Sequence, residues 1–118
     1  MITKQQRDVA DGTLAVRAHL NGSAQVISFS GELDLANAAT AELELSAAMA
    51  SDSQVVVDLR ELEFIDSTGI ALLIAALGRC EEGRELRFVP SQSAAVNRVL
   101  ALTGVAARLP LLDGGLDD

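Results

Sequence analysis

Short apolar runs separated by polar turns follow one another along the chain, and their pattern predicts an α/β fold. Residues 14–20 and 24–30 flank the turn signal Asn21-Gly22, which favours an antiparallel hairpin. Residues 55–59 form a β-branched run without alternation, as in a strand that is covered on both faces. Residues 86–89, before a proline, predict another strand, and a last short strand is expected over residues 107–109.

Helical patterns occupy the segments between these strands. We expect Asp34 to cap a helix over residues 35–50, which the polar segment 51–53 ends. A second helix is expected over residues 70–79, with Gly83 as its stop. A third is expected to begin at Ser91 or Ser93, to present one apolar face and to end at Gly104; that face comprises Val96, Val99, Leu100 and Thr103.

This order of elements predicts a single α/β domain over residues 13–112. Its sheet is expected to be mixed and mostly parallel, with four to five strands, an antiparallel N-terminal edge and three or four packed helices. Residues 1–12 and 113–118 are polar or glycine-rich and are expected to be flexible. Because the turns that follow parallel strands open on one edge of a sheet, Asp34 and the Asp66-Ser67 turn are expected to share a surface.

Composition narrows the classes of partner. The net charge of −8 and the absence of Trp and Tyr argue against nucleic acid or an anionic membrane surface. The charge favours a basic partner, or simply gives solubility. Cys80 is the only cysteine, which excludes an internal disulfide and fits a reducing compartment. The longest apolar run, residues 70–77, is too short to span a bilayer, and the N-terminus lacks the apolar core of a signal peptide. We therefore expect a soluble, cytoplasmic protein.

Four small or polar residues, Asp66-Ser67-Thr68-Gly69, interrupt the apolar pattern and form the candidate site. As a hydrolytic nucleophile Ser67 would need a base, but the only histidine, His19, is expected on an edge strand, and the motif is not G-x-S-x-G. The similarity to the D-[ST]-G element of aspartic proteases lacks the second copy that shares a proton. As the N-cap of a helix, Ser67 would stabilise the fold by roughly 1 kcal/mol.

Metal and nucleotide sites are weakly supported. Asp34, Asp58 and Asp66 could gather at strand ends, but no His or Cys joins them, and Asp58 is more simply a turn former. No phosphate-binding glycine motif is present, although any helix start can bind a phosphate. We expect no cofactor and no metal. A small enzyme or nucleotide-binding protein that uses the surface of Asp34 and Asp66 stays open as an alternative.

Three motifs in order carry a resemblance to a known family. They are G-E-L-D-L over residues 31–35, V-V-D-L over 56–59 leading into F-I-D-S-T-G-I over 64–70, and V-N-R-V-L-A-L-T-G over 96–104. Over nearly its whole length the chain resembles the STAS domain of bacterial anti-sigma-factor antagonists. The resemblance implies a protein that is not an enzyme and whose Ser67 is a phosphoacceptor. It also implies that Ser67 is flanked on a partner-binding face by four residues, Asp34, Asp66, Thr68 and Gly69, with Thr68 as a second candidate acceptor.

The same resemblance implies a partner-switching cycle. The unmodified antagonist binds an anti-sigma factor with serine kinase activity and frees a sigma factor; phosphorylation ends binding, and a serine phosphatase resets the cycle. Many members carry a proline after the G-E-L-D segment, where this chain has Ala36-Asn37-Ala38-Ala39, which affects helix entry more than the switch. The alternative is a STAS domain that serves a stress-signalling scaffold or is the soluble subunit of a lipid or anion transporter.

Overall fold

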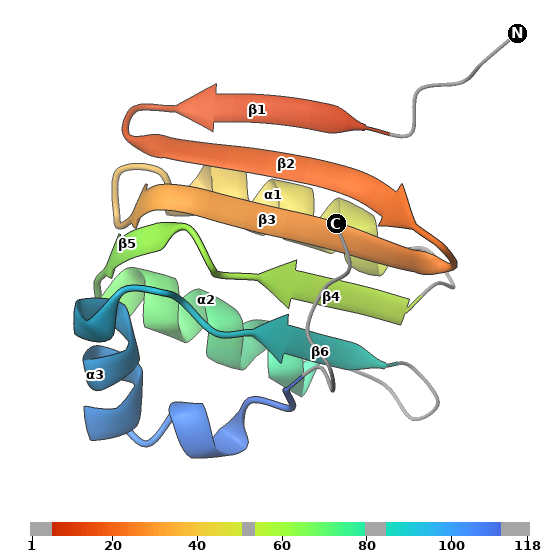
Figure 1. Cartoon of the computed structure of the whole chain (residues 1–118). Coiled ribbons are helices and arrows are strands. Elements are labelled where there is room, and N and C mark those ends of the chain that lie inside the picture. The colour runs from red at the N-terminus through yellow and green to blue at the C-terminus, as the bar shows by residue number, and fades with distance from the viewer. Residues whose placement is uncertain (1–5, 51–53, 80–84, 112–118) are drawn as a thin grey trace, which may run out of the picture.

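The chain folds around one twisted sheet (Figure 1). The computed structural model describes residues 6–50, 54–79 and 85–111, and within them six strands pair in the order β1-β2-β3-β4-β6, with β5 beside β3. The strands are β1 (Arg7–Asp11), β2 (Leu14–Asn21), β3 (Ala24–Leu33), β4 (Gln54–Asp58), β5 (Leu62–Ile65) and β6 (Leu86–Val89). The helices are α1 (Ala38–Met49), α2 (Ser67–Gly78), α3 (Ala94–Leu102) and the 3-10 turn η1 (Ala106–Arg108).

The strand pairing confirms the predicted fold class. β1 with β2 and β2 with β3 are antiparallel, whereas β3 with β4, β3 with β5 and β4 with β6 are parallel. The predicted hairpin joins β2 and β3: Asn21 pairs with Ala24 across a two-residue turn in which Gly22 has φ 66°. A positive φ at the first turn residue matches the twist of the flanking strands and favours glycine there.

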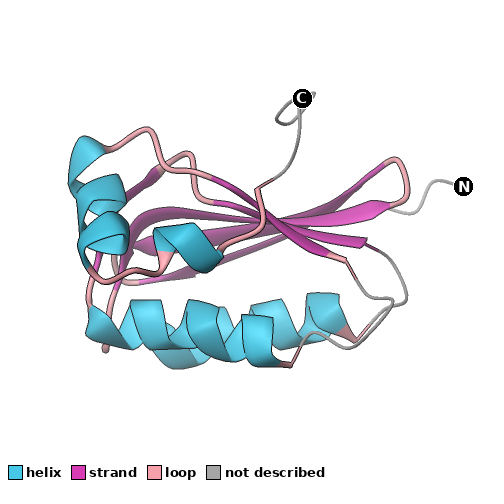
Figure 2. Ribbon diagram, turned by 90° about the horizontal axis from the view of Figure 1, so that it is seen from below, coloured by secondary structure: helices cyan, strands magenta, loops and turns pink. Residues whose placement is uncertain are grey.

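One face of the sheet is covered by α1 and α2, which run side by side along it (Figure 2). Because side chains alternate across a strand, Ile27 and Phe29 of β3 point to this face and are fully buried. Leu45 of α1 and Leu73 of α2 are fully buried in the same core. Each such leucine stabilises the fold by roughly 2 kcal/mol. This two-layer core fixes where the ends of the strands and the starts of the helices lie.

The sequence predicted four to five strands, and it missed β1 and β5. β1 lies within the segment that was expected to be flexible, but Arg7 pairs with Glu44 of α1 at 2.9 Å and Thr40 donates to Asp11 at 2.6 Å. These contacts hold residues 7–11 to the helix layer. β5 was missed because its two middle residues are both exposed, which hides the alternation that marks a half-buried strand. The limits 13–112 for the domain stay a prediction.

The predicted helices are present, with corrected ends. Ser93 caps α3 by accepting from the Val96 amide at 3.4 Å, and Gly104 follows α3 with φ 79°, both as expected. Residues 106–108 form η1 instead of a strand, and a parallel bridge to Phe88 occurs later, at Leu111. The predicted break at 51–53, the stop at Gly83, the lone Cys80 and the tail 113–118 lie outside the described residues.

Candidate functional site

The two acidic turns lie together at one end of the sheet, as the sequence predicted (Figure 1). β3 and β5 are adjacent and parallel, with Leu33 paired with Ile65 in register. The turn after β3 contains Asp34, and the turn after β5 leads through Asp66 into α2. Parallel pairing therefore brings two segments that are about thirty residues apart in sequence to the same edge.

Asp66 joins these two turns through its carboxylate. Its Oδ1 accepts from the Gly69 amide at 3.0 Å and caps α2, while its Oδ2 accepts from the Leu35 amide at 3.1 Å. Its own amide donates to the Leu33 carbonyl at 3.2 Å. The prediction that Ser67 is the N-cap was wrong: Asp66 takes that position because its second oxygen also satisfies an amide of the neighbouring turn.

Ser67 is consequently the first residue of α2, and it is exposed. Its hydroxyl makes no hydrogen bond to any residue that the structure describes. The first amides of a helix carry partial positive charge and lack intrahelical partners, so this position tolerates an anion. Thr68 follows it and is half-buried. Of the two hydroxyls predicted as acceptors, that of Ser67 is the more accessible.

Gly69 sets how closely α2 approaches the sheet. A Cβ at this position would lie 2.7 Å from Ile65 Cγ1, 2.9 Å from Leu33 Cγ and 3.1 Å from the Leu33 carbonyl oxygen. The first two distances are shorter than real Cβ atoms show, so Ile65 and Leu33 would have to shift, and the contact with the backbone carbonyl would also be tight. A side chain here would push α2 away from β3 and lengthen the bonds that Asp66 makes to both turns.

The turn that contains Asp34 is held by its own side chains. Asp34 Oδ1 accepts from the Ala36 amide at 3.0 Å, and Asn37 Oδ1 accepts from the Asp34 amide at 3.0 Å. Asn37 also donates to the Glu32 carbonyl at 2.9 Å and is only 2% exposed. The predicted cap at Asp34 was therefore wrong, because its carboxylate closes a local turn and α1 begins four residues later.

Asn37 is a structural residue of this site that the sequence analysis did not identify. A signal was available, since Asp and Asn three residues apart are typical of side chains that close a turn. With its backbone fixed in this way, the turn holds Leu35 outward at 76% exposure.

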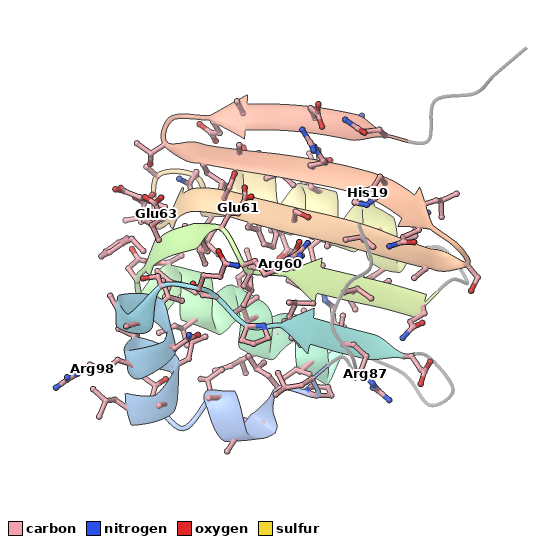
Figure 3. All side chains as sticks on the ribbon, in the orientation of Figure 1. His19, Arg60, Glu61, Glu63, Arg87 and Arg98 are labelled. Atoms are coloured by element: carbon pink, nitrogen blue, oxygen red, sulfur yellow. The ribbon has the colours of Figure 1, made fainter. Side chains whose placement is uncertain are left out.

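Acidic side chains gather around this end of the sheet. Glu61 and Glu63 are exposed there, on the segment that leads into and along β5 (Figure 3), and join three further acids, Glu32, Asp34 and Asp66. Arg60, at the start of that segment, is bound to Asp58, and Arg98 of α3 points away from the sheet (Figure 3). The resulting negative field favours a basic partner surface.

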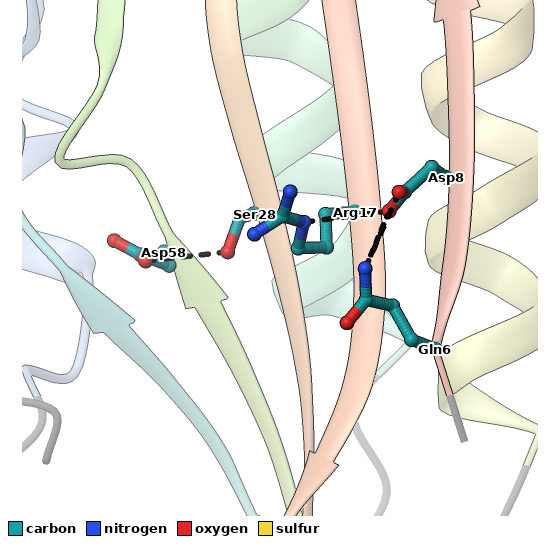
Figure 4. Close-up of polar contacts among 5 residues, drawn as sticks. All are labelled: Gln6, Asp8, Arg17, Ser28 and Asp58. Carbon is teal, nitrogen blue, oxygen red and sulfur yellow. Dashed lines mark hydrogen bonds and ion pairs between the residues drawn. The ribbon is translucent and has the colours of Figure 1, made fainter. Parts of the chain in front are cut away.

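A second group of polar side chains lies on the sheet face opposite α1 and α2 (Figure 4). Here Ser28 donates to Asp58 Oδ2 at 3.2 Å, and the Arg60 guanidinium binds both oxygens of Asp58 at 2.9 and 3.0 Å. Arg17 pairs with Asp8 at 3.3 Å, at the wall of a shallow hollow of about 670 Å³. Asp58 is thus the buried acidic member of a structural ion pair with Arg60.

His19 also lies on this open face, and not on an edge strand, because β1 pairs outside β2 (Figure 3). It is half-buried, and its Nδ1 has no hydrogen-bond partner among the residues that the structure describes. His19 pairs with Val26, which precedes Leu33 by seven residues on β3. At the rise of a β-strand this places it about 20 Å from the end of the sheet that bears Ser67, too far to act as its base.

Two further observations concern metal sites and membranes. Among residues 6–50, 54–79 and 85–111, no three His, Cys, Asp or Glu side chains are placed to share a metal ion. Within the same ranges, every helix is too short or too polar to cross a bilayer.

A mixed sheet backed by two helices on one face, with the loop after β3 meeting the start of α2, defines the STAS-type class of small α/β modules. The chain belongs to the STAS domain family: the model described as "Mlab, STAS domain" matches residues 16–113. The comparison of the sequence with curated proteins found no significant match.

Solved structures of this class include regulators and a transporter domain. An anti-sigma factor antagonist from Mycobacterium paratuberculosis is 27% identical, with a TM-score of 0.79, over 88% of this chain and 89% of that chain. The phosphorylated form of the Bacillus cell fate determinant SpoIIAA is 17% identical, with a TM-score of 0.58, over 84% and 92%. The murine anion transporter Slc26a9 is 18% identical, with a TM-score of 0.63, over 91% of this chain and 19% of the transporter.

Proposed function

We propose that this chain is an anti-sigma-factor antagonist whose binding is switched off by phosphorylation of Ser67. In its unphosphorylated form it binds an anti-sigma factor and releases a sigma factor. The observation that carries the proposal is the exposed Ser67 hydroxyl, which no described residue engages, at a helix start beside Asp66. The antagonist from Mycobacterium paratuberculosis, 27% identical over most of both chains, supports it.

In the proposed cycle the chain is a substrate and the partners are the enzymes. The anti-sigma factor acts as a serine kinase: the Ser67 oxygen attacks the γ-phosphorus of ATP, its proton passes to a base of the kinase, and ADP leaves. A serine phosphatase hydrolyses the phosphoserine and restores the hydroxyl. Thr68 is a weaker second acceptor, because it is half-buried while Ser67 is exposed.

Electrostatics explains why a phosphate would end binding without unfolding the chain. The phosphate adds about −1.5 to −2 charges, which the positive end of α2 accepts. The cost falls on docking, because a hydrated dianion beside Asp34 and Asp66 must lose its water inside an interface. A loss of about 3–4 kcal/mol corresponds to roughly 10²- to 10³-fold weaker binding, which is enough for a switch.

The proposed setting follows from the same chemistry. The proposed kinase and phosphatase would control a sigma factor, and through it transcription and stress responses in the bacterial cytoplasm. The chain is therefore proposed to work there. It is proposed to insert into no membrane and to contact neither DNA nor RNA directly, since its charge of −8 repels phosphate backbones.

The proposal is tested with candidate anti-sigma kinases, ATP and mass spectrometry of the product. We expect one phosphate on Ser67 of the wild type, much slower labelling of Ser67→Ala that is confined to Thr68, and unweakened binding of Ser67→Ala to the kinase. Ser67→Asp should bind about 100-fold more weakly while its free energy of unfolding changes by less than about 0.5 kcal/mol. Ser23→Asp, at an exposed hairpin turn, adds the same charge elsewhere and should bind normally. Equal affinities for wild type and Ser67→Asp would contradict the proposal.

A second candidate is a STAS subunit of a transporter or of a stress-signalling scaffold. The observation that favours the transporter is the "Mlab, STAS domain" description of the matching family model, and the fold also occurs within an anion transporter. Co-purification from the native cell separates the candidates: a transport ATPase would accompany a transporter subunit, whereas a small kinase would accompany an antagonist.

A further inference from the structure

Strand β1 forms one edge of the sheet (Figure 1). It pairs with β2, and no strand that the structure describes lies on its other side. Three of its five residues are exposed and the other two are half-buried. An edge strand offers amide and carbonyl groups to which a further strand can bind, and its charged side chains decide which strand fits. The free edge at β1 is therefore a candidate surface for a second chain.

The register between β1 and β2 shows which backbone groups of β1 are free. Asp11 pairs with Leu14 across a two-residue turn. The residues that flank such a turn form a hydrogen-bonded pair, and hydrogen-bonded pairs alternate with non-hydrogen-bonded pairs along an antiparallel ladder. Asp11 and Val9 therefore bond to β2, whereas the amides and carbonyls of Asp8 and Ala10 point to the free edge.

The side chains of β1 alternate between the two faces of the sheet. Arg7 and Asp11 contact α1, and Val9 between them packs against the core under the helices. Asp8 and Ala10 lie on the opposite, open face, at the wall of the hollow described above. Arg7 keeps 67% of its side chain exposed, so it can bind a second carboxylate in addition to the one on α1.

The sequence of β1 is complementary to itself. In an antiparallel pair of two copies with Val9 opposite Val9, Arg7 of each copy lies opposite Asp11 of the other. Opposite charges in such positions stabilise a sheet, and like charges destabilise it. The same register places Asp8 of each copy opposite Ala10 of the other, so the outward amides and carbonyls of these residues bind one another.

Other registers of this pairing lose the match. The outward groups of the two strands meet only when the register shifts in steps that keep Asp8 and Ala10 in hydrogen-bonded positions. A pair centred on Asp8 places two aspartates directly opposite each other. A pair centred on Ala10 places Arg7 beyond the end of the other strand. The charges therefore select the register centred on Val9.

We propose that β1 is the interface of a homodimer in which two copies of this chain join their sheets by antiparallel pairing of β1 with β1. The dimer has twofold symmetry, because each copy contributes the same five residues. A contact this short is typical of weak, reversible association. The proposal does not rest on the proposed function: β2 and β3 lie between β1 and β5, the strand that leads to Ser67, so the dimer leaves Ser67 accessible.

Charge substitutions at Ala10 test the proposal. Ala10 is exposed and lies opposite Asp8 of the second copy, so a charge at this position meets a carboxylate twice in each dimer. Sedimentation equilibrium of the full chain from about 10 μM to 1 mM, in about 0.15 M salt that screens the charge of −8, measures the dissociation constant. We expect a wild-type dimer, about 5-fold tighter association of Ala10→Lys and about 5-fold weaker association of Ala10→Asp.

Matched controls and a backbone variant complete the experiment. Ala15 is also exposed and pairs with Ala10 from β2, one strand farther from the edge. Ala15→Lys and Ala15→Asp carry the same charges and should change the dissociation constant by less than about 2-fold. Ala10→Pro removes an outward amide and no bond to β2, which edge strands tolerate, so it should leave no dimer while circular dichroism shows a folded chain. If Ala10→Pro does not fold, the charge variants decide alone.

Any of four results would overturn the proposal. A wild type that stays monomeric up to about 1 mM would mean that the charges of β1 protect a free edge. Equal affinities of Ala10→Lys and Ala10→Asp, or a dimer that persists in a folded Ala10→Pro, would place the contact elsewhere. Shifts in the Ala15 variants as large as those in the Ala10 variants would reflect net charge alone. None of these measurements involves a kinase, so none bears on the switch proposed at Ser67.

Discussion

The two polar regions of this domain use the same residue types in opposite ways. On the open face of the sheet, the carboxylate of Asp58 binds the Ser28 hydroxyl and the Arg60 guanidinium. At the end of the sheet, the carboxylate of Asp66 binds two backbone amides, and the Ser67 hydroxyl bonds to no residue in the described part of the chain. The comparison teaches that a serine beside an aspartate keeps an accessible hydroxyl when the carboxylate accepts its hydrogen bonds from backbone amides. When the carboxylate accepts from the serine itself, that hydroxyl is engaged.

The largest effect on stability is expected on the open face, where Asp58 is hydrogen-bonded to other side chains. Asp58→Ala removes the acceptor of the Arg60 guanidinium, of the Arg60 amide and of the Ser28 hydroxyl, with Asp58 only 8% exposed. We expect the free energy of unfolding in urea to fall by about 2–3 kcal/mol.

A pair on the same face provides the control for this prediction. Arg17 and Asp8 are 61% and 60% exposed, so Asp8→Ala should cost less than about 0.5 kcal/mol. Similar losses for Asp8→Ala and Asp58→Ala would show that burial does not distinguish the two pairs.

An intermediate effect is expected at Asp66, where the carboxylate binds amides. Asp66→Ala should lower the free energy of unfolding by about 1–2 kcal/mol, through loss of the cap on α2 and of the bond to the Leu35 amide. Asp66→Asn retains one acceptor oxygen and should lose about half as much. Hydrogen exchange of the Leu35 amide should accelerate in Asp66→Ala. Unchanged protection of this amide would refute the link between the two turns.

The smallest effects compare the two serines directly. Ser28→Ala removes a partly buried hydrogen bond to a charged group and should cost about 1–1.5 kcal/mol. Ser67→Ala removes no hydrogen bond within the described structure and should change the free energy of unfolding by less than about 0.3 kcal/mol. Paired urea titrations measure both. A loss at Ser67 that equals the loss at Ser28 would mean that the Ser67 hydroxyl has a structural role.

The sequence predicted the parts of the fold that local patterns determine. The hairpin with Gly22 and the central strand β4 follow from turn chemistry and hydrophobic runs, and both are present. The cap of α3 was predicted as Ser91 or Ser93, and Ser93 takes that position. β1 could not be predicted in this way, because its polar side chains give no alternation. Its place depends on contacts of Arg7 and Asp11 with α1, which is distant in sequence.

At the candidate site, too, some features were predictable from the sequence and others were not. Parallel strand order was enough to predict that Asp34 and Asp66 meet at one edge. Which residue caps α2 was not predictable, since Asp66 and Ser67 both satisfy the local rule for an N-cap. The choice depends on the Leu35 amide, which only the folded chain brings within reach of Asp66. The roles of Ser67, Thr68 and Gly69 in a switch stay predictions.

The contrast between Ser67 and Gly69 has a consequence for how such a switch can be inherited. Position 67 faces solvent, and its hydroxyl bonds to no residue that the structure describes, so under the proposed function a single codon change there would abolish or restore regulation in a protein that still folds. At position 69 any side chain would force Leu33 or Ile65 to shift, because α2 packs against both residues at that point. Selection on the fold is therefore expected to act on the glycine, whereas the serine would be under selection only through the proposed switch.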